Sequence, residues 1–233
     1  MSPAAAIGAW LTAFSFFVSL ALLGALLFLT IGYAVGAKWP TVVRRLTEAV
    51  ATTFPVLLVA FVPLVLGASQ IYPWPSAGGL DAHARELLEH KAAYLNLPGF
   101  ALRGVLYFVL WIVVSHLLVR SSFSSDEAPA PEPRVSPGAL SAAALPLLAL
   151  SLTFASVDWL MSLDPAWYSS MFGVYYFAGG FVGALGLLSV MAWRLRREPR
   201  VRLANSPSHF HALGRMLLGF CIFWAYIALF RPC

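Results

Sequence analysis

Residues 1–37, MSPAAAIGAWLTAFSFFVSLALLGALLFLTIGYAVGA, contain no charged side chain. An α-helix needs about 20 apolar residues to cross roughly 30 Å of bilayer hydrocarbon, and this run is longer than that. Because lipid offers no hydrogen-bond partner, backbone inside it must satisfy its own polar groups, which a helix does within one segment. A cleavable secretory signal does not explain the run, since no basic residue precedes its apolar part. The stretch therefore predicts a membrane-spanning helix.

The rest of the chain has the same character. Of its 233 residues, 60% are hydrophobic and 11% are charged, against about 45–50% and about 25% in soluble domains. So few charges cannot cover the surface of a soluble protein, and we predict an integral membrane protein in contact with the lipid bilayer. Nucleic-acid binding does not fit the net charge of +5, because the basic residues lie at the ends of apolar runs rather than on one polar face.

Five further apolar stretches resemble the first. They predict a single all-α transmembrane helix bundle over residues 1–233, with alternating β-barrel segments of about ten residues nowhere evident. The six expected spans lie at about 7–37, 49–68, 101–120, 138–158, 171–193 and 212–230.

Lysine and arginine gather on one side of these spans. Only four of the 15 fall on the side that holds both termini, namely Arg85, Lys91, Arg103 and Arg231. By the positive-inside rule, the arginine-rich loops are cytoplasmic and both termini are periplasmic.

Three connecting segments differ in kind. Residues 121–137, SSFSSDEAPAPEPRVSP, are rich in serine and proline and predict a flexible cytoplasmic linker. Residues 69–98 include DAHARELLEHKAAYL, which suggests an amphipathic helix on the outer membrane surface. Residues 159–170, WLMSLDPAWYSS, predict a short outer turn whose aromatic residues, Trp159 and Tyr168 among them, lie in the interfacial belt.

Proline and glycine residues within the spans predict helix kinks and close helix contacts. Pro55 and Pro63 predict kinks in the second span. Gly179, Gly183 and Gly186 predict a face of the fifth span that packs closely against another helix.

Ionisable groups at membrane depth are costly, so each is a candidate functional residue. Asp158 closes the apolar run SLTFASVDW and can exchange protons with the outer side, or it can simply be a solvated cap. Arg103 enters the third span from the same side and can pair with Asp158 or Asp164, or extend to the membrane surface. Asp164 before Pro165 predicts a helix N-cap, and Tyr176 can line the same polar path.

Other candidates lie toward the inner side. Glu48 follows Arg44 by four residues and is either an inner proton-exchanging group or a structural cap. His211 is a second inner candidate. Two histidines at equal depth, His116 and His211, can alternatively ligate a b-type haem. The two cysteines, twelve residues apart, exclude a covalently attached c-type haem and a self-contained iron–sulfur cluster.

Four stretches are more specific in sequence than an apolar membrane span requires. They are KWPTVVRRLTEAV (38–50), KAAYLNLPGFALRGVLYFVLW (91–111), LTFASVDWLMSLDPAWYSSMFGVYYFAGGFVGALG (152–186) and HALGRMLLGFCIFWAYIALF (211–230). Together they resemble the quinol:cytochrome c oxidoreductase membrane subunit of bacterial alternative complex III, the ActF family, which is related to polysulfide-reductase-type (NrfD-like) integral subunits.

The resemblance implies a subunit of a respiratory complex in the bacterial cytoplasmic membrane that oxidises quinol. Haem c and iron–sulfur clusters are then expected on a multihaem cytochrome c subunit and an iron–sulfur subunit. A sister NrfD-like membrane subunit is the expected holder of the quinol pocket. This chain is expected to bind no cofactor, to be non-catalytic alone, and to supply a helix bundle with a proton path that includes Asp158 and His211.

The chain also differs from that family in one respect. Members of that family have further spans beyond the WAY segment, so we expect this chain to be truncated relative to them. A small secondary transporter or channel is the alternative class, although it predicts an internal repeat, and none is found.

Overall fold

The computed structural model describes residues 2–37, 41–75, 82–126, 136–165, 167–195 and 207–229, and every element in these ranges is helical. The elements are α1 (Pro3–Ser19), η1 (Leu20–Leu27), α2 (Phe28–Ala34), α3 (Thr41–Ala51), α4 (Phe54–Leu66), α5 (Ala68–Ile71), α6 (Ala82–Lys91), α7 (Leu97–Asp126), α8 (Pro137–Trp159), η2 (Met161–Leu163), α9 (Phe172–Leu195) and α11 (Pro207–Leu229).

Six stretches of the described residues are long and apolar enough to cross a membrane. They are Pro3–Ala34, Arg44–Leu66, Leu97–Phe123, Pro137–Leu163, Phe172–Arg194 and Phe210–Leu229. The prediction of an all-α polytopic bundle is therefore confirmed, with each span within a few residues of its expected place.

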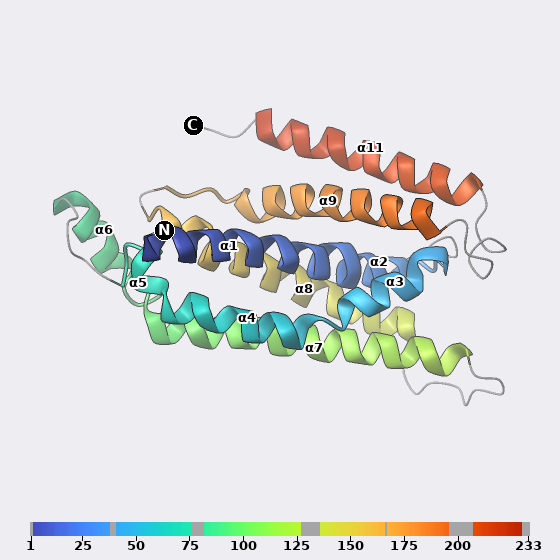
Figure 1. Cartoon of the computed structure of the whole chain (residues 1–233), viewed down its shortest axis with the longest axis horizontal. Helices are drawn as coiled ribbons and strands as arrows, with labels where there is room; N and C mark the ends of the chain where they lie inside the picture. Colours follow the sequence, from blue (N-terminus) through green and yellow to red (C-terminus); the bar gives the residue numbers. More distant parts are fainter. Residues whose placement is uncertain are drawn as a thin grey trace.

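The first span forms the centre of the bundle (Figure 1). Its three elements α1, η1 and α2 follow one another without interruption and pack against α3, α4, α8 and α9. The middle element, η1, is a π-helix with seven of its eight residues buried. A helix that is apolar on every side belongs in the interior, which accounts for the absence of charge in η1; the exposed apolar residues of α1, such as Phe16 and Phe17, suit contact with lipid.

Close helix contact at η1 depends on small residues. A Cβ atom added to Gly24 would lie 2.5 Å from the Cβ of Ala184 in α9. One turn away, a Cβ on Gly180 would overlap the Leu23 side chain. The backbones of η1 and α9 therefore approach each other closely at Gly24 and Ala184, and the Leu23 side chain lies against Gly180.

The glycine face predicted for the fifth span is partly correct. Gly179 meets the indole of Trp224 in α11, where an added Cβ would lie 2.8 Å from Nε1. Gly183 and Gly186, in contrast, have nothing within 4 Å of an added Cβ. The close contact of α9 thus involves Gly179, Gly180 and Ala184.

The predicted linker 121–137 is wrong over its first six residues and ends within one residue of the start of α8. Helix α7 continues through Asp126. Helix α8 already begins at Pro137, where the Ser136 hydroxyl accepts a hydrogen bond from the Ala139 amide at 3.2 Å. This N-cap, followed by proline in the first helical turn, is a standard helix start, and residues 127–135 lie outside the described residues.

The second span is interrupted where proline predicted a kink. Helix α3 ends at Ala51, and α4 begins at Phe54 with Pro55 in its first turn. Pro63 lies inside α4. Because the break follows Ala51, Glu48 lies within α3 and does not open a new helix.

The two ends of the bundle differ in charge. The start of α1 and the end of α11 lie at the same end as α5 and α6 (Figure 1). Among described residues, that end carries Arg85, Lys91 and Arg103, whereas the other end carries five arginines. These are Arg44, Arg45, Arg120, Arg194 and Arg215. The charge asymmetry seen in the sequence is therefore an asymmetry of the folded bundle.

We expect Gly24→Ala to lower the free energy of unfolding by about 1–3 kcal/mol, because the new methyl group overlaps Ala184 in a packed interior. Gly183→Ala is the matched control, since it adds the same atom to a helix where nothing lies within 4 Å. Unfolding by a denaturing detergent in mixed micelles measures both. Equal stability of the two variants would show that the η1–α9 contact is not tight.

Candidate functional site

Aromatic rings fill the core at the α6 end of the bundle. Trp159, only 2% exposed, is surrounded by Phe14, Phe61, Phe108 and Trp111, with ring centroids 5.1 to 5.9 Å from its own. The prediction that Trp159 lies in the interfacial belt is therefore wrong. Helix α8 continues through this residue and directs it into the bundle.

Beside this cluster, Asp158 and Arg103 form a two-pronged ion pair. Arg103 Nε donates to Asp158 Oδ2 and Nη2 donates to Oδ1, each at 2.9 Å. The Tyr107 hydroxyl donates to Oδ2 at 2.8 Å. The Asp158 side chain is 1% exposed and that of Arg103 is 20% exposed. Three donors thus converge on a carboxylate that is shielded from solvent, and two of them bear the opposite charge.

The start of α7 positions the arginine. Asn96 Oδ1 accepts a hydrogen bond from the Gly99 amide at 2.8 Å, which caps the helix. Gly99 also leaves room for the guanidinium, because a Cβ there would lie 3.0 Å from Arg103 Nη1. Arg103 Nη1 donates to the Tyr94 carbonyl at 3.0 Å, and the guanidinium lies 3.9 Å from the centroid of the Tyr94 ring. The segment before α7 therefore holds Arg103 from the side opposite to Asp158.

The Asp158 carboxylate also affects the pKa of Tyr94. Burial, and then the negative charge of Asp158, raises the pKa of the Tyr94 hydroxyl above its ordinary value. This phenol consequently remains a neutral hydrogen-bonding group at physiological pH.

Two further hydrogen bonds fix the end of α8. The Tyr72 hydroxyl donates to the Trp159 carbonyl at 2.9 Å, and the Ser162 hydroxyl donates to the Asp158 carbonyl at 2.5 Å. Carbonyl groups at a helix end have no partner within the helix, and here side chains supply one. The backbone that carries Asp158 is thereby held from two sides.

Asp164 does not take part in the Arg103 pair. It is exposed and follows η2, and α9 begins only at Phe172. The prediction that Asp164 caps the next helix is therefore wrong, because irregular chain separates the two. Of the two acidic partners that the sequence offered to Arg103, the structure selects Asp158.

Tyr176 belongs to a different polar group. Its hydroxyl accepts a hydrogen bond from Ser19 Oγ at 2.6 Å and donates to the Ser15 carbonyl at 3.2 Å. Both serines lie in α1 just before η1. Tyr176 thus joins α9 to the central helix, and its hydrogen bonds do not connect it to Asp158.

Glu48 anchors a third polar cluster, at the arginine-rich end. Its side chain is 4% exposed and accepts from Arg45 Nη1 at 2.7 Å, while Arg44 Nε lies 3.6 Å away. The Ser122 hydroxyl of α7 also donates to Glu48, and Arg45 lies over the Phe123 ring. Sequence reasoning missed Ser122 because it fell in the segment interpreted as linker.

The histidines do not form a haem site between helices. His116 on α7 and His211 on α11 are both exposed, and α7 and α11 lie on opposite sides of the bundle (Figure 1). The side chain of His209 lies outside the described residues. Among described residues, no group of three or more His, Cys, Asp or Glu could hold a metal ion.

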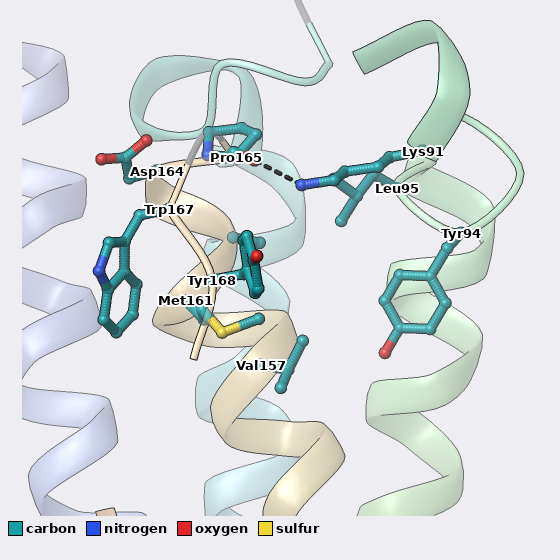
Figure 2. A pocket seen from close by; sticks show the side chains of 10 residues that line it. Lys91, Tyr94, Leu95, Val157, Met161, Asp164, Pro165, Trp167 and Tyr168 are labelled. Atoms are coloured by element: carbon teal, nitrogen blue, oxygen red, sulfur yellow. Dashed lines mark hydrogen bonds between the residues drawn. The ribbon is translucent and has the colours of Figure 1, made fainter. Parts of the chain in front are cut away.

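A pocket of about 490 Å³ adjoins the Asp158 pair at the outer surface of the bundle. Figure 2 shows Lys91 and Tyr94 on one side and Val157, Met161 and Tyr168 on the other. Lys91 Nζ donates to the Pro165 carbonyl at 2.6 Å and so bridges the two sides (Figure 2). No sequence pattern predicted this pocket, because its walls come from the segments around α6, the end of α8 and η2, which only the fold brings together.

Comparison of the chain with models of known protein families and with curated proteins finds no match. The fold and the site geometry define an all-α membrane bundle with a buried ion pair at one end.

We expect Arg103→Met to destabilise the bundle by about 3–5 kcal/mol, because it leaves the buried Asp158 carboxylate without its counter-charge. The double variant Arg103→Met/Asp158→Leu removes both charges and should be more stable than the single variant. Unfolding in mixed micelles measures both. If the double variant were the less stable of the two, the carboxylate would not depend on Arg103.

Proposed function

We propose that this chain is the integral membrane subunit of a quinol-oxidising respiratory complex of the alternative complex III type, and that its Asp158 site exchanges protons. The carrying observation is the buried group of Asp158, Arg103 and Tyr107. Charges are expensive at membrane depth, and well-packed apolar residues often stabilise a core as well as a buried ion pair does. A bundle whose role was only structural would not need this pair.

The location of the resemblance supports the proposal. Arg103 and Tyr107 fall in the family-like stretch 91–111, and Asp158 falls in the stretch 152–186. These two stretches, distant in sequence, meet at one site. The residues that suggest the family are therefore those that build the buried charge cluster.

The geometry sets a condition on proton exchange. Both oxygens of Asp158 accept hydrogen bonds, three in all. The two Arg103 donors thus compete with a proton for the carboxylate oxygens. In this mechanism, proton uptake and release by Asp158 accompany movement of Arg103 between the carboxylate and the Tyr94 segment. Electron transfer would proceed on partner subunits, through haem c and iron–sulfur clusters.

In this proposal, the orientation of the bundle in the membrane follows from the charges at its two ends. With the arginine-rich end in the cytoplasm of a bacterium, Asp158 lies toward the periplasm and Glu48 toward the cytoplasm. Glu48 and its serine and arginine partners then form the inner counterpart of the Asp158 site.

We expect the tagged chain, purified from its native membrane in mild detergent, to bring with it a multihaem cytochrome c subunit, an iron–sulfur subunit and a second membrane subunit. Mass spectrometry and the visible spectrum of the preparation test this. A stable preparation of the chain alone, without colour, would contradict the respiratory assignment and favour a small transporter.

We expect Asp158→Asn to abolish proton coupling while the complex still assembles, because an amide keeps the shape of the carboxylate but cannot take up a proton. The readout is proton release per quinol oxidised in sealed vesicles. Asp158→Glu retains a titratable group and should retain coupling. Asp164→Asn, which changes an exposed carboxylate at the same end, is the matched control. Unchanged turnover and proton stoichiometry in Asp158→Asn would refute the proton role.

A further inference from the structure

The ammonium group of Lys91 carries a positive charge that no described carboxylate balances. Lys91 is half-buried at the end of α6. It donates to the Pro165 carbonyl, a neutral acceptor, at 2.6 Å, and the ion pairs of the described residues do not include it. An ammonium group has three donors, so two remain for another partner. Because charges that are partly removed from water are normally paired, an anionic ligand fits this position.

The cavity beside this ammonium group is mostly apolar. Its volume of about 490 Å³ lies within the range of roughly 300–1,000 Å³ that is usual for ligand pockets. Leu95, Val157 and Met161 contribute aliphatic surface to its lining, and Trp167 and Tyr168 contribute rings. An apolar group that enters the cavity is removed from water by these walls, which is favourable.

Three other polar side chains of the lining do not offer a second charge to a ligand. The Tyr94 hydroxyl interacts with Asp158 and Tyr107, and the Ser162 hydroxyl donates to the Asp158 carbonyl. Asp164 has its carboxylate on the far side of Pro165 from the ammonium group (Figure 2). Lys91 is therefore the charged group that a ligand in this pocket would meet.

The pocket lies at the level where two spans leave the bilayer. The span Leu97–Phe123 begins just after Leu95, and the span Pro137–Leu163 ends next to Asp164. Tyr168 is 81% exposed, and aromatic side chains with a polar tip favour the headgroup region of a membrane. An amphiphile in the bilayer can therefore place its polar group near Lys91 while its tail remains in apolar surroundings.

The cation and the apolar cavity together select the class of ligand. A soluble anion would pair with Lys91 but leave the apolar walls unfilled. A neutral lipid would fill the cavity but leave the ammonium group without an anion. A glycerophospholipid meets both requirements, because its phosphodiester is an anionic hydrogen-bond acceptor and its acyl chains are apolar.

We propose that this pocket binds one glycerophospholipid of the surrounding membrane. Its phosphodiester accepts a hydrogen bond from Lys91, and part of an acyl chain lies against Val157 and Met161 in the cavity. Lys91 and Pro165 lie on opposite sides of the pocket (Figure 2), so the lipid joins the segment after α6 to the end of α8. This inference does not depend on the respiratory role proposed above.

The test uses the whole chain, purified and delipidated in detergent, and titrated with dioleoylphosphatidylglycerol. Native mass spectrometry measures lipid binding to a variant and to the unsubstituted chain in the same spectrum. We expect Lys91→Gln to weaken binding about tenfold, because it removes a charge-assisted hydrogen bond. Lys91→Arg keeps the charge and should retain binding. Dioleoylglycerol, which has the same acyl chains without the phosphate, is the matched control and should bind equally to Lys91→Gln and to the unsubstituted chain.

A second set of variants tests the cavity. Val157→Phe fills it and should weaken the binding of both lipids several-fold. Val109→Phe makes the same change at an exposed position of α7 and should bind as the unsubstituted chain does. If Val157→Phe folds poorly, Tyr168→Ala, which removes a wall of the pocket at an exposed position, should weaken binding in the same way.

Three outcomes would overturn the proposal. Equal affinity of phosphatidylglycerol for Lys91→Gln and for the unsubstituted chain would show that Lys91 does not hold the phosphate. Displacement of the lipid by inorganic phosphate would indicate a site for a soluble anion. Tighter Lys91-dependent binding of oleate than of phosphatidylglycerol would indicate a fatty-acid site. Recovery of the chain with or without haem-bearing partners bears only on the respiratory role, so the two proposals fail separately.

Discussion

The end of the bundle that holds the site depends on a single buried ion pair, Arg103 with Asp158. Asp158 lies in the last turn of α8, where the negative end of the helix dipole disfavours a carboxylate. Helix stability alone therefore does not account for an acid at this position. The two-pronged contact, with Tyr107 as a third donor, offsets both the dipole and the loss of water. Without it, the aromatic cluster around Trp159 would pack against an unpaired charge.

A second constraint acts at the centre of the membrane. The middle of the first span, η1, is buried on nearly all sides by other helices, and its π-helical turn lies where Gly24 meets Ala184. π-Helical turns are rare and frequently accompany functional sites. Here the turn directly follows Ser19, which hydrogen-bonds to Tyr176 of α9. The central helix thus contacts α9 twice in succession: through the Ser19–Tyr176 hydrogen bond and, within the π-helical segment, through the Gly24–Ala184 packing contact.

The sequence predicted what depends on hydrophobicity and charge. Six spans, the break before Pro55 and the pairing of Arg103 with a carboxylate at the same end of the bundle all follow from local patterns. Trp159 was misplaced because an aromatic residue at the end of an apolar run is typical of a membrane interface. The competing signal was helical spacing, since Leu152, Ala155 and Trp159 share one buried face. The pocket was beyond prediction, because its walls come from separate segments whose relative position only the fold sets.

The pocket and the ion pair share Tyr94, and this makes them energetically dependent. The Tyr94 ring lies over the Arg103 guanidinium, and its backbone carbonyl accepts from Arg103 Nη1. Movement of Arg103 away from Asp158 would therefore also disturb the Tyr94 wall of the pocket, so the two features depend on one another.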